Sequence, residues 1–352
     1  MKKLLLLVAS ITVALLIGEL VVRSLDLSPS ITRVGVGHYQ LSENPLIRFE
    51  YKKSAKPAKN VPEGWLGHAV RGSLWDTFYT NSFGFRDVDH PLVKPENTIR
   101  IAVMGDSITS AQNVEREHRY SELLEKMLNR GQGKKRYEVL NFGVAGYDIL
   151  QEVATLKEKV LQFAPDLAIF GYCLNDHDPS ADSSIYRILL DRLTPDHRNS
   201  LHSLYTHTRR PFLALLHRSH LYRYLKYAAF RTTSMGDEAS SELYEPASNI
   251  LPTAFSMLSE LRRDHAFEVL IVIFPSFLKL SNGYPFHHIH DHVKGYARHY
   301  NIPVLDLYGA YARETVEDGS EFRDTKDDYC HPNERGHQIA AKAIYHLLKS
   351  RY

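Results

Sequence analysis

From residue 99 onward, short apolar runs alternate with amphipathic segments. Five runs predict buried strands, at 99–104, 137–142, 167–173, 268–274 and 302–307. Segments with helical periodicity lie between or after these runs, near 118–130, 148–163, 251–264, 285–300 and 333–350. Nearly continuous apolar strands alternating with helices are typical of a parallel sheet covered on both faces. With right-handed crossovers, the pattern predicts an α/β fold, namely a three-layer α/β/α sandwich with a flavodoxin-like five-stranded parallel sheet.

The longest departure from this alternation is the segment 178–250, between the third strand and the helix before the fourth. Amphipathic helical patterns occur in it at 185–193 and 219–230, and the stretch 182–231 carries nine Lys and Arg residues against three Asp residues. A connection of this length is unusual, so we expect a helical insertion. It could form a lid over the site, a surface facing anionic lipid headgroups, or a solvated decoration.

Residues 28–98 show no clear helical or strand period and hold scattered Pro, Gly and Lys residues. We expect an amino-terminal leader that packs on the core of the main domain, at 99–352. Its aromatic stretch Thr-Asn-Ser-Phe-Gly-Phe-Arg-Asp, at 80–87, either forms one wall of a substrate cleft or straps the amino-terminal segment to the core.

The amino terminus has the pattern of a targeting or membrane segment. Lys2 and Lys3 precede an apolar run from Leu4 to Gly18, which Leu20–Val22 extends beyond Glu19. This predicts a membrane anchor or signal segment over residues 1–27. Because no small-x-small cleavage site follows the run, we expect an inner-membrane anchor with the body facing the periplasm or cell exterior, or a secreted protein if the segment is cleaved.

Composition narrows the choice of partners. The chain is 43% hydrophobic and 24% charged, with a net charge of +2, which is ordinary for a globular protein and argues against nucleic acid as a partner. Its two cysteines, Cys173 and Cys330, can form neither a disulfide framework nor a Cys-rich zinc site. A single bridge between them stays open, as does separate packing near one crevice.

Polar residues follow the predicted strands at the edge where parallel sheets bind ligands. Ser107 follows the first strand, Gly146 lies in the loop after the second, and Asn175 follows the third. Asp328 and His331 lie three residues apart in the loop before the last helix, a spacing that allows a direct hydrogen bond. Ester hydrolysis through serine needs a nucleophile, a base, a group that orients the base, and donors for the oxyanion.

These stretches, in this order, resemble the SGNH hydrolases, also called the GDSL esterase/lipase family. Gly105-Asp106-Ser107 is similar to the first family block, Gly146 to the second, Asn175 to the third, and Asp328-x-x-His331 to the last. The leader with its Asn-Ser-Phe-Gly-Phe-Arg-Asp stretch resembles bacterial members with an amino-terminal anchor. One difference is Gln112, which stands where relatives often have glycine.

The resemblance implies a role for each matching residue. Ser107 is expected to be the nucleophile, His331 the general base and Asp328 the residue that orients it. The oxyanion hole would consist of the amides of Ser107 and Gly146 and the side chain of Asn175. Asp106, Asp176, Gly143 and His337 are expected to be structural.

The expected reaction is hydrolysis of an acyl ester, O-acetyl or another short acyl group, through an acyl-enzyme on Ser107. The alternatives are an O-acyltransferase acting on an envelope or exported glycan and a lipase-like esterase. The expected partners are an acylated glycan or small acyl ester and, through the amino-terminal segment, the membrane. No cofactor or metal is expected: Asn175–Asp178 lacks the ligand spacing of a metallophosphoesterase, and the helical pair His288 and His292 lacks a third ligand.

Overall fold

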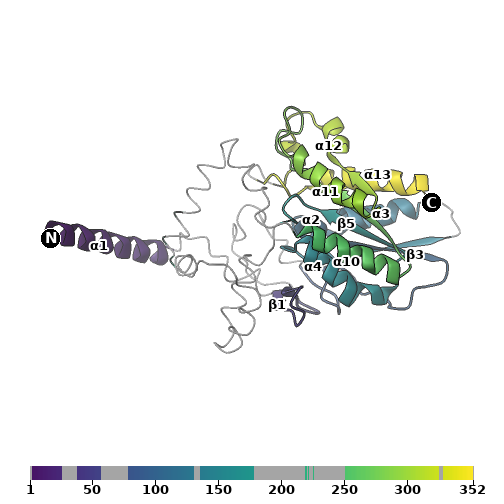
Figure 1. The fold of residues 1–352 in the computed structure, drawn as a ribbon, viewed down its shortest axis with the longest axis horizontal. Helices are drawn as coiled ribbons and strands as arrows, with labels where there is room; N and C mark the ends of the chain where they lie inside the picture. The colour runs from purple at the N-terminus through teal and green to yellow at the C-terminus, as the bar shows by residue number, and fades with distance from the viewer. Residues whose placement is uncertain are drawn as a thin grey trace.

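A five-stranded parallel sheet lies at the centre of the computed structural model (Figure 1). The structure describes residues 2–25, 38–56, 78–130, 135–177, 250–324 and 328–351, with the single positions 219, 221 and 225. The strands are β3 (Thr98–Gly105), β4 (Arg136–Asn141), β5 (Leu167–Tyr172), β6 (Glu268–Ile273) and β7 (Val304–Asp306). Their order is β4-β3-β5-β6-β7, which confirms the predicted flavodoxin-like sheet. Apart from residue 250 and those single positions, the predicted insertion at 178–250 lies outside the described residues.

The strand β3, which leads to the candidate nucleophile, lies between β4 and β5 in the sheet. Ile101 of β3 pairs with Val139 of β4 on one side and with Leu167 of β5 on the other. Every residue of β5 is buried, as expected for a strand covered on both faces. The loops after β4 and β5 therefore flank the loop after β3 at the carboxyl edge of the sheet.

Helices form the two outer layers of the sandwich. The helix α3 (Tyr120–Leu128) packs with α13 (Glu334–Arg351), and α10 (Leu251–Asp264) packs with α4 (Ile149–Thr155) and α11 (His287–His299). Figure 1 shows α4 and α10 on one side of the strands and α13 on the other. The shorter helices are α2 (Ser107–Ser110) and α12 (Tyr308–Glu314). The remaining turns are η3 (Arg116–His118), η4 (Leu156–Val160), η5 (Leu161–Phe163) and η7 (Ser320–Phe322).

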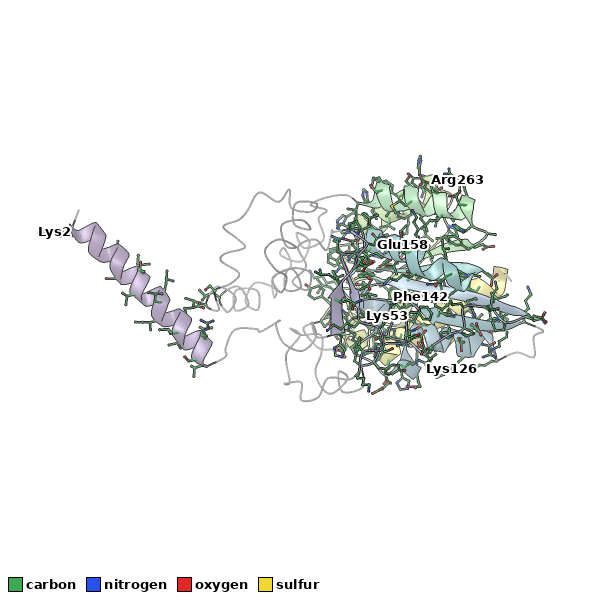
Figure 2. All side chains as sticks on the ribbon, turned by 90° about the horizontal axis from the view of Figure 1, so that it is seen from below. Lys2, Lys53, Lys126, Phe142, Glu158 and Arg263 are labelled. Atoms are coloured by element: carbon green, nitrogen blue, oxygen red, sulfur yellow. The ribbon has the colours of Figure 1, made fainter. Side chains whose placement is uncertain are left out.

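A small antiparallel hairpin precedes the sheet, in the leader, where the sequence shows no clear strand period. It pairs β1 (Tyr39–Leu41) with β2 (Phe49–Tyr51), and Tyr39 lies opposite Tyr51. Figure 2 shows the hairpin against the α/β unit, and the labelled Lys53 lies just beyond it. The Phe49 ring packs edge-on against Tyr147, with 5.6 Å between the ring centroids. Strands of three residues are too short to produce a detectable period, so the sequence of the leader does not reveal them.

The stretch 80–87 straps the amino-terminal segment to α2, the helix that begins at the candidate nucleophile. Arg86 is buried, and its guanidinium donates to the carbonyls of Ser110, Ala111 and Val114. Phe85 stacks edge-on against Phe142, with ring centroids 4.9 Å apart. The strap therefore satisfies carbonyls at the end of α2 and in the turn that follows it.

At the amino terminus, α1 (Lys2–Ser24) is a single helix of 23 residues (Figure 1). Glu19 accepts hydrogen bonds from the Ser219 hydroxyl at 2.7 Å and the Leu221 amide at 2.9 Å. Among the residues that the structure describes, none of the helices combines the length and the apolar character needed to cross a membrane. The predicted transmembrane segment is thus without support here.

Candidate active site

The turn that carries Ser107 depends on the glycine before it. Gly105 ends β3 with φ of 156°, and a Cβ atom built there would lie 2.0 Å from the hydroxyl of Thr109. Asp106 caps the next helix by accepting a hydrogen bond of 2.8 Å from the Ile108 amide. The chain therefore turns sharply, and Ser107 stands at the first position of α2, directly beyond the sheet.

The structure joins Ser107, His331 and Asp328 by hydrogen bonds. Nε2 of His331 lies 2.8 Å from Oγ of Ser107, and Nδ1 lies 2.8 Å from Oδ2 of Asp328. The other oxygen of Asp328 accepts from the amides of Cys330 at 3.0 Å and His331 at 2.9 Å. These amide bonds fix the carboxylate, so its second oxygen faces the imidazole ring.

Electrostatics favours the charged forms of both the carboxylate and the imidazole. Burial raises the pKa of Asp328, but the hydrogen bond and the charge of His331 outweigh it, and the net pKa is lowered. Burial by itself lowers the pKa of His331, whereas Cys330, Asp328 and Asp106 raise it, and the net result is a pKa of about 10. An imidazolium next to Ser107 is therefore well stabilised.

The loops expected to supply oxyanion donors lie on either side of Ser107. Gly146, with φ of 86°, is in the loop after β4, and Asn175 is exposed in the loop after β5. The amide of Ile149 donates to the Asp176 carbonyl at 3.1 Å and joins the two loops. Asp176 also accepts from the Cys173 amide at 2.6 Å, the bracing role expected of it. Gly146 and Asn175 thus share one sheet edge with Ser107.

The two cysteines meet at this site as free thiols. The thiol of Cys173 is hydrogen-bonded to the sulfur of Cys330, which precedes His331. This bond, followed by burial, raises the pKa of Cys173, and the same bond is the main cause that lowers the pKa of Cys330. The bond connects the loop that carries Asn175 to the loop that carries His331.

Three buried carboxylates lie behind the nucleophile turn. Glu152 and Asp176 are fully buried, and burial is the main cause that raises the pKa of each. Burial also raises the pKa of Asp106, and its charge adds to the repulsion on the other two. At neutral pH the proton is therefore retained more readily on these groups than on ordinary carboxyls.

Two groups among the described residues have ligand atoms within 4.8 Å of one another, as a metal ion requires. The first group is Asp328, Cys330 and His331. Both ring nitrogens of His331 are already hydrogen-bonded, one to Asp328 and the other to Ser107. The second is Glu317, Asp318 and Glu321; Glu321 braces its own turn, accepting from the amides of residues 316, 317 and 319. Neither group contains His288 or His292.

Three residues that contact the candidate site were not assigned to it from the sequence. Tyr39 and Tyr51 of the hairpin bond to the backbone of Ala145, and Gln112 donates to the Tyr51 hydroxyl. Gln112 stood out as a difference from relatives, but neither tyrosine has a motif around it. Gly143 and His337 lie in the scaffold, as expected: His337 is fully buried and stacks on Tyr120, with ring centroids 5.9 Å apart.

Comparisons with known proteins find the same family pattern. The pattern of the GDSL-like lipase/acylhydrolase family matches residues 103–339. No curated protein sequence matches the chain. Among solved structures, an acetyl xylan esterase has 16% identity and a TM-score of 0.42, covering 71% of this chain and all (100%) of its own. A lipolytic G-D-S-L family protein from Veillonella parvula has 14% identity and a TM-score of 0.40, covering 71% of this chain and 98% of its own.

Proposed function

Because the chain belongs to the GDSL-like lipase/acylhydrolase family and is an SGNH-type ester hydrolase, we propose that Ser107 is its nucleophile, with His331 as general base and Asp328 as the orienting carboxylate. The family match confirms the resemblance that the motifs predicted. The observation that carries the assignment of roles is the pair of 2.8 Å hydrogen bonds on the two ring nitrogens of His331.

The proposed reaction begins with attack of Ser107 Oγ on the ester carbonyl. His331 Nε2 takes the hydroxyl proton, and the imidazolium that forms is stabilised by Asp328. The tetrahedral oxyanion accepts hydrogen bonds from the amides of Ser107 and Gly146 and the side chain of Asn175. When the intermediate collapses, His331 returns the proton to the leaving alcohol, and the acyl group stays on Ser107. Water then repeats the steps and releases the acid.

Asp328 selects the tautomer that this reaction needs. Its Oδ2 accepts from Nδ1 of His331, so the proton of a neutral imidazole sits on Nδ1. The lone pair on Nε2 is then directed at the Ser107 hydroxyl. An amide at position 328 could present its nitrogen instead, which would favour the opposite tautomer.

For the substrate we propose a short acyl ester, such as an O-acetyl group, on a polar alcohol such as a glycan. Among the described residues, none of the exposed large apolar side chains lies in the loops that carry Ser107, Gly146, Asn175 and His331. Asn175 itself is exposed, so the described rim of the site is polar. A polar rim suits a sugar hydroxyl better than a long acyl chain, whose binding needs buried apolar surface.

We also propose that the chain is exported, with its body in the periplasm or outside the cell. Lys2 and Lys3 precede the apolar run, and on α1 Leu16 and Leu20 are 59% and 62% exposed. Exposed apolar side chains on one helix favour recognition by an export machinery or by lipid. Protease treatment of spheroplasts tests this proposal, and amino-terminal sequencing that begins near Ser24 would identify a cleaved signal.

Hydrolysis of p-nitrophenyl acetate by the full chain tests the proposed chemistry. Ser107→Ala should abolish turnover and leave the unfolding temperature near that of wild type. Ser350→Ala, an exposed serine in α13, is the matched control and should retain full activity. Near-normal turnover of purified Ser107→Ala would overturn the serine mechanism, and loss of wild-type activity in EDTA would indicate a metal-dependent one. Acetylated glycan should be preferred over a long-chain ester.

A further inference from the structure

The carbonyl of Ala145 and the amide N–H of Gly146 belong to one peptide unit. Tyr39, in the amino-terminal hairpin, donates its hydroxyl proton to this carbonyl at 3.2 Å. In a trans peptide the C=O and N–H bonds point in opposite directions. With the carbonyl held toward the hairpin, the N–H of Gly146 must point away from it. That N–H is the one proposed above as an oxyanion donor.

The hydroxyl of Tyr51 holds the preceding amide. The N–H of Ala145 donates to it at 3.1 Å, and the side chain of Gln112 donates to it as well. A phenolic oxygen has two lone pairs and one proton, so these two donors fill its acceptor sites. The Tyr39 hydroxyl also lies 3.5 Å from this oxygen, farther than the 3.2 Å to the Ala145 carbonyl, to which its single proton is therefore assigned. Its proton is then left for Oγ of Ser110, 3.1 Å away in the helix that begins at Ser107. Ala145 is thus fixed at both its amide and its carbonyl.

Both hydroxyls lie where water cannot replace them. Tyr39 is 4% exposed and Tyr51 is fully buried. Burial is the main cause that raises the pKa of each, so both remain protonated donors in the ordinary pH range. A buried hydrogen bond polarises the peptide that accepts it, which makes the N–H at the other end a better donor.

The hairpin is anchored on the far side of Gly146 too. Arg48 forms a buried ion pair with Asp148, the residue that caps α4. Gln151 of the same capping box donates to the Ile47 carbonyl at 2.6 Å. The hairpin therefore contacts the loop both before and after Gly146, and it cannot move without moving that loop.

We infer that the hairpin serves catalysis: Tyr39 is a positioning residue that orients the Ala145–Gly146 peptide toward the oxyanion, and Tyr51 couples this peptide to the nucleophile helix. This inference rests on the proposed function of Gly146. Loss of the Tyr39 hydroxyl frees the peptide to tilt, which weakens one oxyanion donor without removing it. We expect about a tenfold fall in kcat, smaller than the loss of about 10²–10³ for removal of a whole donor. KM should stay within about twofold, since a neutral ester carbonyl gains little from this donor.

The experiment compares two full-length variants that each lose one buried tyrosine hydroxyl. Tyr39→Phe removes the bond to Ala145, and Tyr311→Phe removes a bond of 2.8 Å from Tyr311 to the Gly336 carbonyl. The readouts are kcat and KM on p-nitrophenyl acetate, the inhibition constant of a boronic acid that adds to the serine as a tetrahedral anion, and the unfolding temperature. Tyr39→Phe should lower kcat and weaken boronate inhibition by similar factors. Tyr311→Phe should change only stability.

A wild-type kcat in Tyr39→Phe, or an equal fall in both variants, would overturn the role of the hairpin. If Tyr39→Phe does not fold, Tyr51→Phe takes its place and should lower kcat with unchanged KM for the same reason. Failure of the proposed function gives a different result. In that case the boronic acid would not inhibit the wild-type enzyme, or Ser107→Ala would stay active.

Discussion

The thiol of Cys173 is hydrogen-bonded to the sulfur of Cys330, one residue before the candidate base His331. The two cysteines are 157 positions apart in the chain (330 minus 173). Cys173 follows β5, whereas Cys330 lies in the loop before α13. One contact therefore joins the loop that bears Asn175 to the loop that bears the base, and it brings two oxidisable atoms together.

This contact predicts that a mild oxidant forms a Cys173–Cys330 disulfide. In exchange with oxidised glutathione, two thiols lose their protons and electrons to the glutathione disulfide, which is reduced to two thiols. Intact mass after alkylation without reductant should then show no added alkyl group, and two after reduction. Cys173→Ser should retain a single cysteine that is alkylated or glutathionylated. Two alkyl groups on the treated wild-type chain, before any reductant, would contradict the prediction.

The pH dependence of kcat/KM should respond to Cys330. Burial lowers the pKa of His331, but Cys330 and the bond to Asp328 raise it to a net value of about 10. A general base acts only when deprotonated, so activity should rise with pH until His331 loses its proton. Cys330→Ser removes the ionisable thiol that raises the pKa of His331, so the rising limb should move to lower pH. The measurement is kcat/KM from pH of about 5 to about 11.

Tyr329→Phe is the control for that shift, because it alters the same loop without removing the thiol. Its rising limb should coincide with that of wild type. If Cys330→Ser and wild type share one profile, Cys330 does not set the charge state of His331.

Much of the sheet could be predicted from local patterns. All six residues of β5 are buried, and their unbroken apolar run is what the sequence shows. The hairpin gave no such signal, since each of its strands has three residues and is held by contacts with distant parts of the chain. Tyr39 reaches a carbonyl 106 positions away, and no local periodicity encodes a contact of that range.

In the candidate site, too, some residues could be predicted from the sequence and others could not. Asp328 and His331 could be paired from their spacing, because residues three apart in a loop can bond directly. Ser107 joins them through a bond across 224 positions, which followed from motif order and sheet topology together. The roles of Tyr39 and Tyr51 could not be predicted, because buried tyrosines are common in cores and only the bonding pattern distinguishes these two.

Asn175→Ala should separate transition-state binding from stability. The side chain is exposed, so its removal should leave the unfolding temperature unchanged. If it donates to the oxyanion, kcat should fall by about 10²–10³ with little change in KM. Steady-state kinetics on p-nitrophenyl acetate measures both constants.

The matched control is Asn129→Ala, at the end of α3. Its side chain donates to the carbonyls of Glu125 and Tyr137 at 3.0 and 2.9 Å, so its loss should lower stability and spare kcat. A kcat for Asn175→Ala within about twofold of wild type would remove this residue from the oxyanion hole.

Gly143→Ala and Gly295→Ala should change stability in opposite directions. A Cβ atom at Gly143 would lie 2.4 Å from the backbone nitrogen of Ser110, in the helix that begins at Ser107. Backbone cannot yield as a side-chain end can, so we expect a loss of about 1–3 kcal/mol in the free energy of unfolding. At Gly295, within α11, a Cβ atom meets nothing within 4 Å. Alanine there should stabilise the protein by about 0.5–1 kcal/mol, because it restricts the unfolded chain and favours the helix. Denaturant unfolding of both variants measures these changes.

Since Gly143 packs directly against α2, its variant should also lose turnover, whereas Gly295→Ala should keep the wild-type kcat. Equal stability of Gly143→Ala and wild type would mean that the nucleophile helix is not held against the loop after β4 as tightly as this contact requires.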